Sequence, residues 1–166
     1  MNSNELNKMV LEHALDGLYA HVLPSRAVEG LTAALASRKA EGFQHTIFQL
    51  IEHMNYWQDI FLKDVYRTHF VKPQHASDGW TANEIPADEN ELKVSVEKFL
   101  MGLQDAKRCA KNIDENAREI DRGDMIVDVY DVLHSLASHN SYHLGQIVTL
   151  RHIFGAWPPP SGGMTW

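Results

Sequence analysis

The sequence predicts an all-α protein, a four-helix bundle that ends in an extended, proline-rich tail. Long stretches repeat apolar residues at alternating spacings of three and four, which is typical of one face of a helix. No stretch alternates convincingly with a period of two, and there is no internal repeat. The length of 166 residues suits one domain with a sizeable core, so we expect a single domain over residues 1–166.

Composition and charge narrow the functional class. The formal charge is −7, and an acidic chain without a basic run is a poor binder of nucleic acid or anionic membranes. The start of the chain lacks the pattern of a signal peptide, and no apolar run approaches the roughly 20 residues that span a bilayer. Cys109 is the only cysteine. We therefore expect a soluble, reduced, cytoplasmic protein that binds neither nucleic acid nor membranes.

The first half of the chain contains three predicted helical stretches. Residues 4–23 form the first, and Pro24 must start a new segment or kink the old one. Residues 24–37 form a second piece, broken or bent near residues 30–32. The third begins at a capping box made by Thr46 and Gln49 and runs to about Phe70.

The second half begins with the longest loop, residues 71–86, which is the best candidate for a lid or a mobile edge. A long helix follows from about 88 to 116, and then a charged turn at 118–124. Asp128 is the preferred cap of the last helix, residues 129–154. Residues 155–166 cannot be helical. We expect them to be extended and to lie back on the bundle through Trp157 or Trp166.

The last predicted helix carries two histidines on its apolar face. The three-and-four rhythm of its apolar residues continues through His139, His143 and Gln146. Buried polar groups are costly unless they are satisfied, so these groups either bond to their neighbours or hold a metal. Residues four apart on a helix share a face, which lets two imidazoles converge on one ion. Asn140 stands where the zinc-peptidase helix has its glutamate, which excludes peptide hydrolysis by that route.

A metal held by this pair needs a ligand from another helix, and His53 is the best candidate because it lies on the inward side of its helix. Three neutral imidazoles and a water would form an open site of the catalytic type. A structural or sensor site would be closed by a fourth protein ligand, with His13 or His21 as the first suspects. We expect one divalent ion, zinc or nickel first, with iron, copper or manganese as alternatives. Hydrogen-bonded core histidines are the competing interpretation.

Residues 46–57 together with residues 139–151 resemble the DinB/YfiT-like superfamily, and the Trp-Pro-Pro-Pro-Ser-Gly-Gly tail is similar to a subgroup of it. The resemblance implies a four-helix bundle with an up-up-down-down course and a divalent metal bound by three histidines. Matched residue by residue, these are His53, His139 and His143. The resemblance also implies a homodimer.

The same resemblance implies an activity. Characterised members of the family are similar to transferases that use low-molecular-weight thiols such as bacillithiol, and others are described as metal-dependent hydrolases. We therefore predict a metal-dependent thiol transferase acting on small electrophiles, with a hydrolase or a non-catalytic metal-binding or sensor protein as alternatives. Gln146 could orient a ligand or a bound water, and Tyr142 could supply a phenol near the site. Core packing is the alternative role for both.

Overall fold

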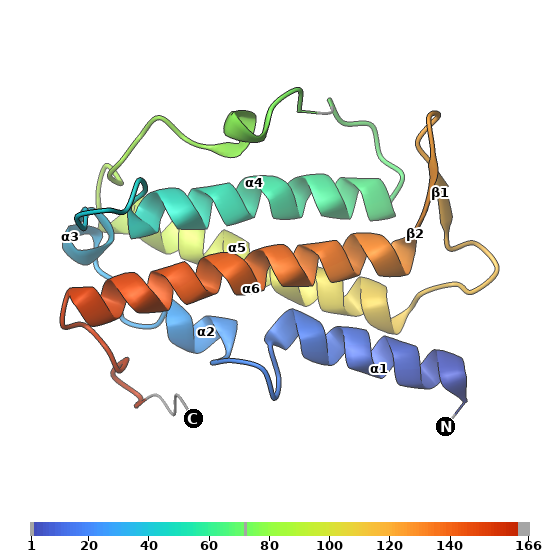
Figure 1. Ribbon diagram of the computed structural model, residues 1–166, viewed down its shortest axis with the longest axis horizontal. Helices are drawn as coiled ribbons and strands as arrows, with labels where there is room; N and C mark the ends of the chain where they lie inside the picture. Colours follow the sequence, from blue (N-terminus) through green and yellow to red (C-terminus); the bar gives the residue numbers. More distant parts are fainter. Residues whose placement is uncertain (1, 72, 163–166) are drawn as a thin grey trace.

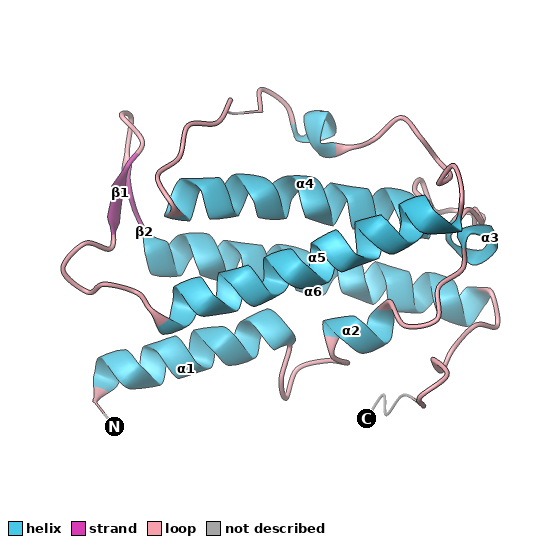
Figure 2. Ribbon diagram, turned by 180° about the vertical axis from the view of Figure 1, so that it is seen from behind, coloured by secondary structure: helices cyan, strands magenta, loops and turns pink. Residues whose placement is uncertain are grey.

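The computed structural model describes residues 2–71 and 73–162, which form a mostly helical bundle with one small hairpin (Figures 1 and 2). The elements are α1 (Ser3–Asp16), α2 (Pro24–Ala27), α3 (Ala33–Ala36), α4 (Ile47–Val65), the 3₁₀ helix η1 (Ala76–Gly79), α5 (Glu89–Lys111), β1 (Glu119–Asp121), β2 (Ile126–Asp128) and α6 (Val129–Ile153). Within these residues, no helix is both long enough and apolar enough to cross a membrane.

The long helices α1, α4, α5 and α6 lie side by side, and α4 and α1 each contact both α5 and α6 (Figure 1). Asn55 bonds to Ser95 and Tyr66 bonds to Asp105, so α4 and α5 run in the same direction. α1 and α6 run in the opposite direction. The course is therefore up-down-down-up rather than the expected up-up-down-down. The reason is that the return segment, residues 66–71 and 73–88, travels back along α4 before α5 begins.

The first predicted helix is shorter than expected, because α1 ends at Asp16 and not at residue 23. Gly17 follows in the left-handed region (φ 66°), where a glycine has no steric cost, and its N–H bonds back to Ala14. The predicted break in residues 24–37 is confirmed, since α2 and α3 are separate four-residue helices. Figure 2 shows α2 continuing the row of α1 along the bundle.

The predicted starts of the later helices are confirmed. At the start of α4, Thr46 accepts a bond from the Gln49 N–H (3.2 Å) and the Gln49 side chain accepts one from the Thr46 N–H (3.1 Å). Asp128 accepts from the Tyr130 N–H at the start of α6. The end of α4 was placed too late: it ends at Val65, because Arg67 turns into the left-handed region (φ 54°).

The charged turn predicted at 118–124 belongs to a hairpin that the sequence did not indicate. β1 and β2 pair antiparallel, with Ile120 opposite Val127. Each strand has three residues, and only Ile120 of β1 is buried. Three residues are too few for a period of two to be recognisable.

Buried polar side chains on α4 and α6 separate two apolar clusters. The first cluster joins α2 and α3 to the start of α4 and the end of α6, and the second joins α1 to the end of α4 and the start of α6. Gln58 donates to the Phe99 carbonyl (3.0 Å) and accepts from Asn140 (3.1 Å). The polar layer between the clusters comprises His53, Asn55, Gln58, Asn140 and His143.

The described part of the C-terminal segment, residues 155–162, lies back on the bundle. Trp157 lies 5.3 Å from the Arg151 guanidinium, which is buried and donates to the Ala27 carbonyl. Ser161 donates to the Glu29 carboxylate. Residues 155–162 contain no helix, as predicted, and Trp166 lies outside the described residues.

Candidate metal centre

The antiparallel packing of α4 against α6 brings together the three histidines that the sequence singled out. One ring nitrogen from each of His53, His139 and His143 lies within 4.8 Å of the others. The Nε2 atoms of His53 and His139 are 3.2 Å apart. The side chains of His53 and His143 are each only 5 % exposed, and His139 is half-buried. Three imidazoles therefore converge inside the bundle, between the two apolar clusters.

Hydrogen bonds hold two of the rings so that one nitrogen is left for a ligand. His53 Nδ1 donates to the Gly79 carbonyl (3.0 Å), and His143 Nδ1 donates to Gln146 Oε1 (2.7 Å). A proton on Nδ1 leaves the lone pair on Nε2 of each ring. Bonds of this kind from the outer nitrogen orient metal-binding histidines and raise their basicity. His139 Nδ1 is buried and has no hydrogen-bond partner among the described residues.

The surroundings keep the imidazoles neutral. The pKa of His53 is lowered to about 4, mainly by burial and in part by repulsion from His143, and the bond to Gly79 acts in the opposite direction. Burial also lowers the pKa of His139 to about 4, with His143 and His53 acting in the same direction. The pKa of His143 is lowered by burial and partly restored by the bond to Gln146. Neutral imidazole is the form that binds metal, so near pH 7 protons compete little for these nitrogens.

The geometry fits a divalent ion. Tetrahedral coordination at zinc–nitrogen distances of 2.0–2.1 Å places the ligand nitrogens about 3.3 Å apart. The His53–His139 separation of 3.2 Å already matches that value. The three candidate ligand nitrogens of the cluster lie within 4.8 Å of one another, so the two that are farthest apart must approach by at most about 1.5 Å to bind one ion. The donor set, imidazole only, suits zinc, nickel, copper or iron.

Neither histidine suspected of closing the site belongs to the cluster. Both ring nitrogens of His21 are engaged elsewhere, Nδ1 with the Val22 carbonyl (2.7 Å) and Nε2 with the Ser141 hydroxyl (2.8 Å). His13 lies edge-on to Tyr19. Within residues 2–71 and 73–162, the cluster consists of three histidines and includes no carboxylate or thiol. This arrangement corresponds to the open type of site, which leaves a coordination position for a water or a substrate.

Comparison with protein families agrees with this geometry. A family model described as the DinB superfamily matches residues 23–147, a range that includes all three histidines. The chain belongs to the DinB superfamily. A comparison with curated proteins gave no match. The family and the three-histidine cluster together support a metal-binding DinB-like protein.

In this DinB superfamily member, the return segment forms part of the site, which the sequence did not indicate. Trp80 is stacked between two imidazoles, with ring centroids 3.7 Å from His53 and 3.5 Å from His45. Its ring also lies edge-on to His143. Trp80 was not among the site residues that the sequence indicated. Trp80 belongs to an irregular segment, where no helical spacing marks a side chain as inward.

The loop predicted at 71–86 as a lid or a mobile edge makes up most of the return segment, and the structure ties this segment to α4 at several points. Besides the bond from His53 to Gly79, the Thr46 hydroxyl donates to the Glu84 carbonyl (2.6 Å) and the Gln49 amide donates to the Thr81 carbonyl (3.1 Å). In Figure 1 this segment runs along the outer side of α4. It therefore covers the histidine cluster on the α4 side.

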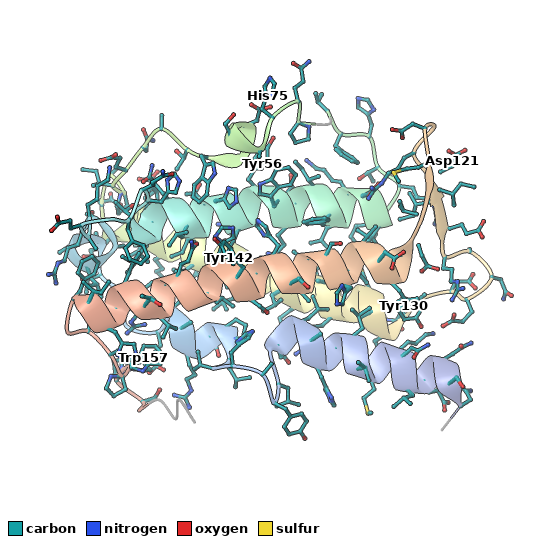
Figure 3. All side chains as sticks on the ribbon, viewed as in Figure 1. Tyr56, His75, Asp121, Tyr130, Tyr142 and Trp157 are labelled. Atoms are coloured by element: carbon teal, nitrogen blue, oxygen red, sulfur yellow. The ribbon has the colours of Figure 1, made fainter. Side chains whose placement is uncertain are left out.

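The two residues proposed to support the ligands differ in their contacts. Gln146 bonds to His143, as the supporting role requires. Tyr142 is 65 % exposed, and its ring lies edge-on to His143 with centroids 5.0 Å apart. Figure 3 shows Tyr142 midway along α6, and Tyr56 between α4 and the return segment. The roles of Gln146 and Tyr142 in binding or catalysis stay predictions.

Proposed function

We propose that this DinB superfamily protein is a metal-dependent enzyme that transfers a low-molecular-weight thiol to a small electrophile. The observation that carries the proposal is the convergence of three neutral histidines without a fourth protein ligand among the described residues. A site closed by four protein ligands would suit a structural or sensor role, whereas three ligands leave room for a substrate atom.

A divalent ion in this site, zinc or nickel first, would lower the pKa of a bound thiol from its ordinary value of about 8.5 and so supply a thiolate at neutral pH. The protein would hold the imidazoles for this purpose. The Gly79 carbonyl and Gln146 fix two of the rings, and the Trp80 indole shields one face of His53 from water. Burial keeps the rings unprotonated.

A hydrolase is the alternative function, because three imidazoles around zinc can also activate water, whose pKa then falls from about 15.7 to about 7. A thiol, with an ordinary pKa of about 8.5, needs a smaller shift to ionise at neutral pH. Zinc peptidases add a glutamate as the general base on the ligand helix. Asn140, at the position of the base in zinc peptidases, is turned to Gln58.

Metal content is the first test. Untagged protein, purified without added metal, should carry about one divalent ion per chain by elemental analysis, as one three-histidine site requires. His143→Ala should lose that ion. His134→Ala is the matched control, because His134 is an exposed histidine of the same helix, and it should keep the ion. Equal metal content in the two variants would refute the site.

Activity is the second test. Metal-loaded and chelator-treated protein are each mixed with monobromobimane and bacillithiol, cysteine or glutathione. In the reaction the thiolate sulfur bonds to the bromomethyl carbon, bromide leaves with the electron pair of the broken bond, and the thiol proton passes to solvent. We expect a faster rate with the metal-loaded protein for at least one thiol. Equal rates for the two forms with all three thiols would remove the transferase proposal.

A further inference from the structure

A cavity of about 870 Å³ lies at the C-terminal end of α4, between the return segment and the β1–β2 hairpin. This volume falls within the usual range of small-molecule sites, which are mostly apolar and carry a few polar groups. The apolar side chains that line it are Trp57, Ile60, Phe61, Phe70, Pro73 and Ile120.

The cavity and the histidine cluster share a wall. Trp57 and Phe61 line the cavity, and their ring centroids lie 6.3 and 6.4 Å from the ring of His139. Trp57 also lies edge-on to His53. A molecule bound in the cavity would therefore be one aromatic side chain away from two of the candidate ligands.

The two guanidinium groups that line the cavity are already bonded within the protein. Arg122 forms an ion pair with Asp64, which is buried. The Arg67 guanidinium donates to the backbone carbonyls of Ala117 and Glu119. The exposed carboxylates of Glu119 and Asp121 also line the cavity and would repel an anion. Transfer of an unpaired ligand charge to the apolar walls is costly.

We infer that this cavity binds an uncharged, largely aromatic or aliphatic small molecule. Its role as the electrophilic substrate rests on the proposed function, whereas binding itself depends only on the cavity walls. The apolar body of such a molecule would lie against Ile60, Phe70 and Ile120, with one end against Trp57, which separates the cavity from the histidines. The carboxylates of Glu119 and Asp121 at the edge of the cavity would discriminate against anions.

A matched pair of fluorescent probes tests the inference on the full chain. N-phenyl-1-naphthylamine is uncharged, and 1-anilinonaphthalene-8-sulfonate has the same ring system with an added sulfonate. We expect the uncharged probe to bind at one site with enhanced, blue-shifted emission, and at least tenfold more tightly than the sulfonate. No saturable binding of the uncharged probe, or tighter binding of the sulfonate, would overturn the inference.

Variants locate the binding. Ile60→Glu places a charge in the cavity wall and should weaken binding of the uncharged probe at least tenfold. The matched control is Ile153→Glu, at an exposed position at the end of α6, which should bind like the wild type. Phe70→Ser, outside any helix, is a second cavity variant and should also weaken binding of the uncharged probe. It replaces Ile60→Glu in the test if that variant does not fold. Unchanged binding in a folded cavity variant would refute the location.

The outcomes separate this inference from the proposed function. Probe binding to both chelator-treated and metal-loaded protein, without metal-dependent turnover, would support the cavity and overturn the transferase proposal. If turnover occurs, the uncharged probe should compete with monobromobimane. Turnover that the probe does not inhibit would show that the cavity is not the substrate site.

Discussion

Acidification should destabilise the metal-free protein because His53 and His139 are buried as neutral imidazoles. In the folded chain the pKa of each is about 4, against an ordinary value of 6.5. The unfolded chain therefore takes up protons between about pH 6.5 and 4 that the folded chain does not. Because the unfolded chain binds more protons, a fall in pH lowers its free energy relative to the folded chain. The stability contributed by these groups is therefore complete above pH 6.5 and declines towards pH 4.

The size of the effect follows from the two pKa values. At pH 5, each histidine lowers the free energy of unfolding by about 2 kcal/mol relative to pH 8. The rings face each other, so a proton on one opposes a proton on the other, and both stay neutral in the folded chain. Their effects should add to about 4 kcal/mol, a large share of the roughly 5–15 kcal/mol that stabilises a typical domain.

Urea unfolding in the presence of a chelator, followed by tryptophan fluorescence at pH 8 and pH 5, measures the loss. Carboxylates also titrate in this range, and a comparison of variants cancels their effect. His139→Gln should lose about 2 kcal/mol less than the wild type between the two pH values. His134→Gln, which alters an exposed histidine of α6, should behave like the wild type. If His139→Gln loses as much as the wild type, His139 is not held neutral by burial.

Three further substitutions test the surroundings of the cluster. Gly79→Ala would place a Cβ 2.4 Å from Trp57 Nε1, so urea unfolding should show a loss of about 1–3 kcal/mol. Gln146→Leu removes the acceptor for His143 Nδ1, and chelator competition should show metal affinity lowered about 10–100-fold; unchanged affinity would remove its supporting role. Thr46→Ala removes the α4 cap and should cost about 1 kcal/mol in urea unfolding, with metal content unchanged.

The sequence predicted those parts of the fold that depend on local chemistry. The caps at Thr46 and Asp128 were placed correctly, because a capping side chain bonds within three residues of itself. The ends of α1 and α4 were placed too late. Backbone turns end both helices, at Gly17 and Arg67, and apolar residues beyond them still fit the helical spacing. The helix directions depend on the path of the return segment, which has no periodic signal.

In the candidate site, too, the sequence predicted the residues marked by local spacing and missed those that depend on the path of the return segment. His139 and His143 were recognisable from their spacing, and the structure places them against His53 as expected. Gly79 and Trp80 were not recognisable. Gly79 acts through its backbone carbonyl and through the space that its missing side chain leaves for Trp57. Neither property is visible in a residue pattern, because both depend on where the return segment lies against α4.

The amides beside the histidines fix how far α4 can slide along α6. A shift of one helical turn, about 5.4 Å, would remove Gln58 from both the Phe99 carbonyl and Asn140 and leave those groups buried without partners. A helix interface built of leucines alone would tolerate several relative positions of α4 and α6, whereas the buried amides find their hydrogen-bond partners in a single register. The register that aligns the imidazoles is therefore selected by neighbouring amides, and the chain should assemble its ligand set before any ion arrives.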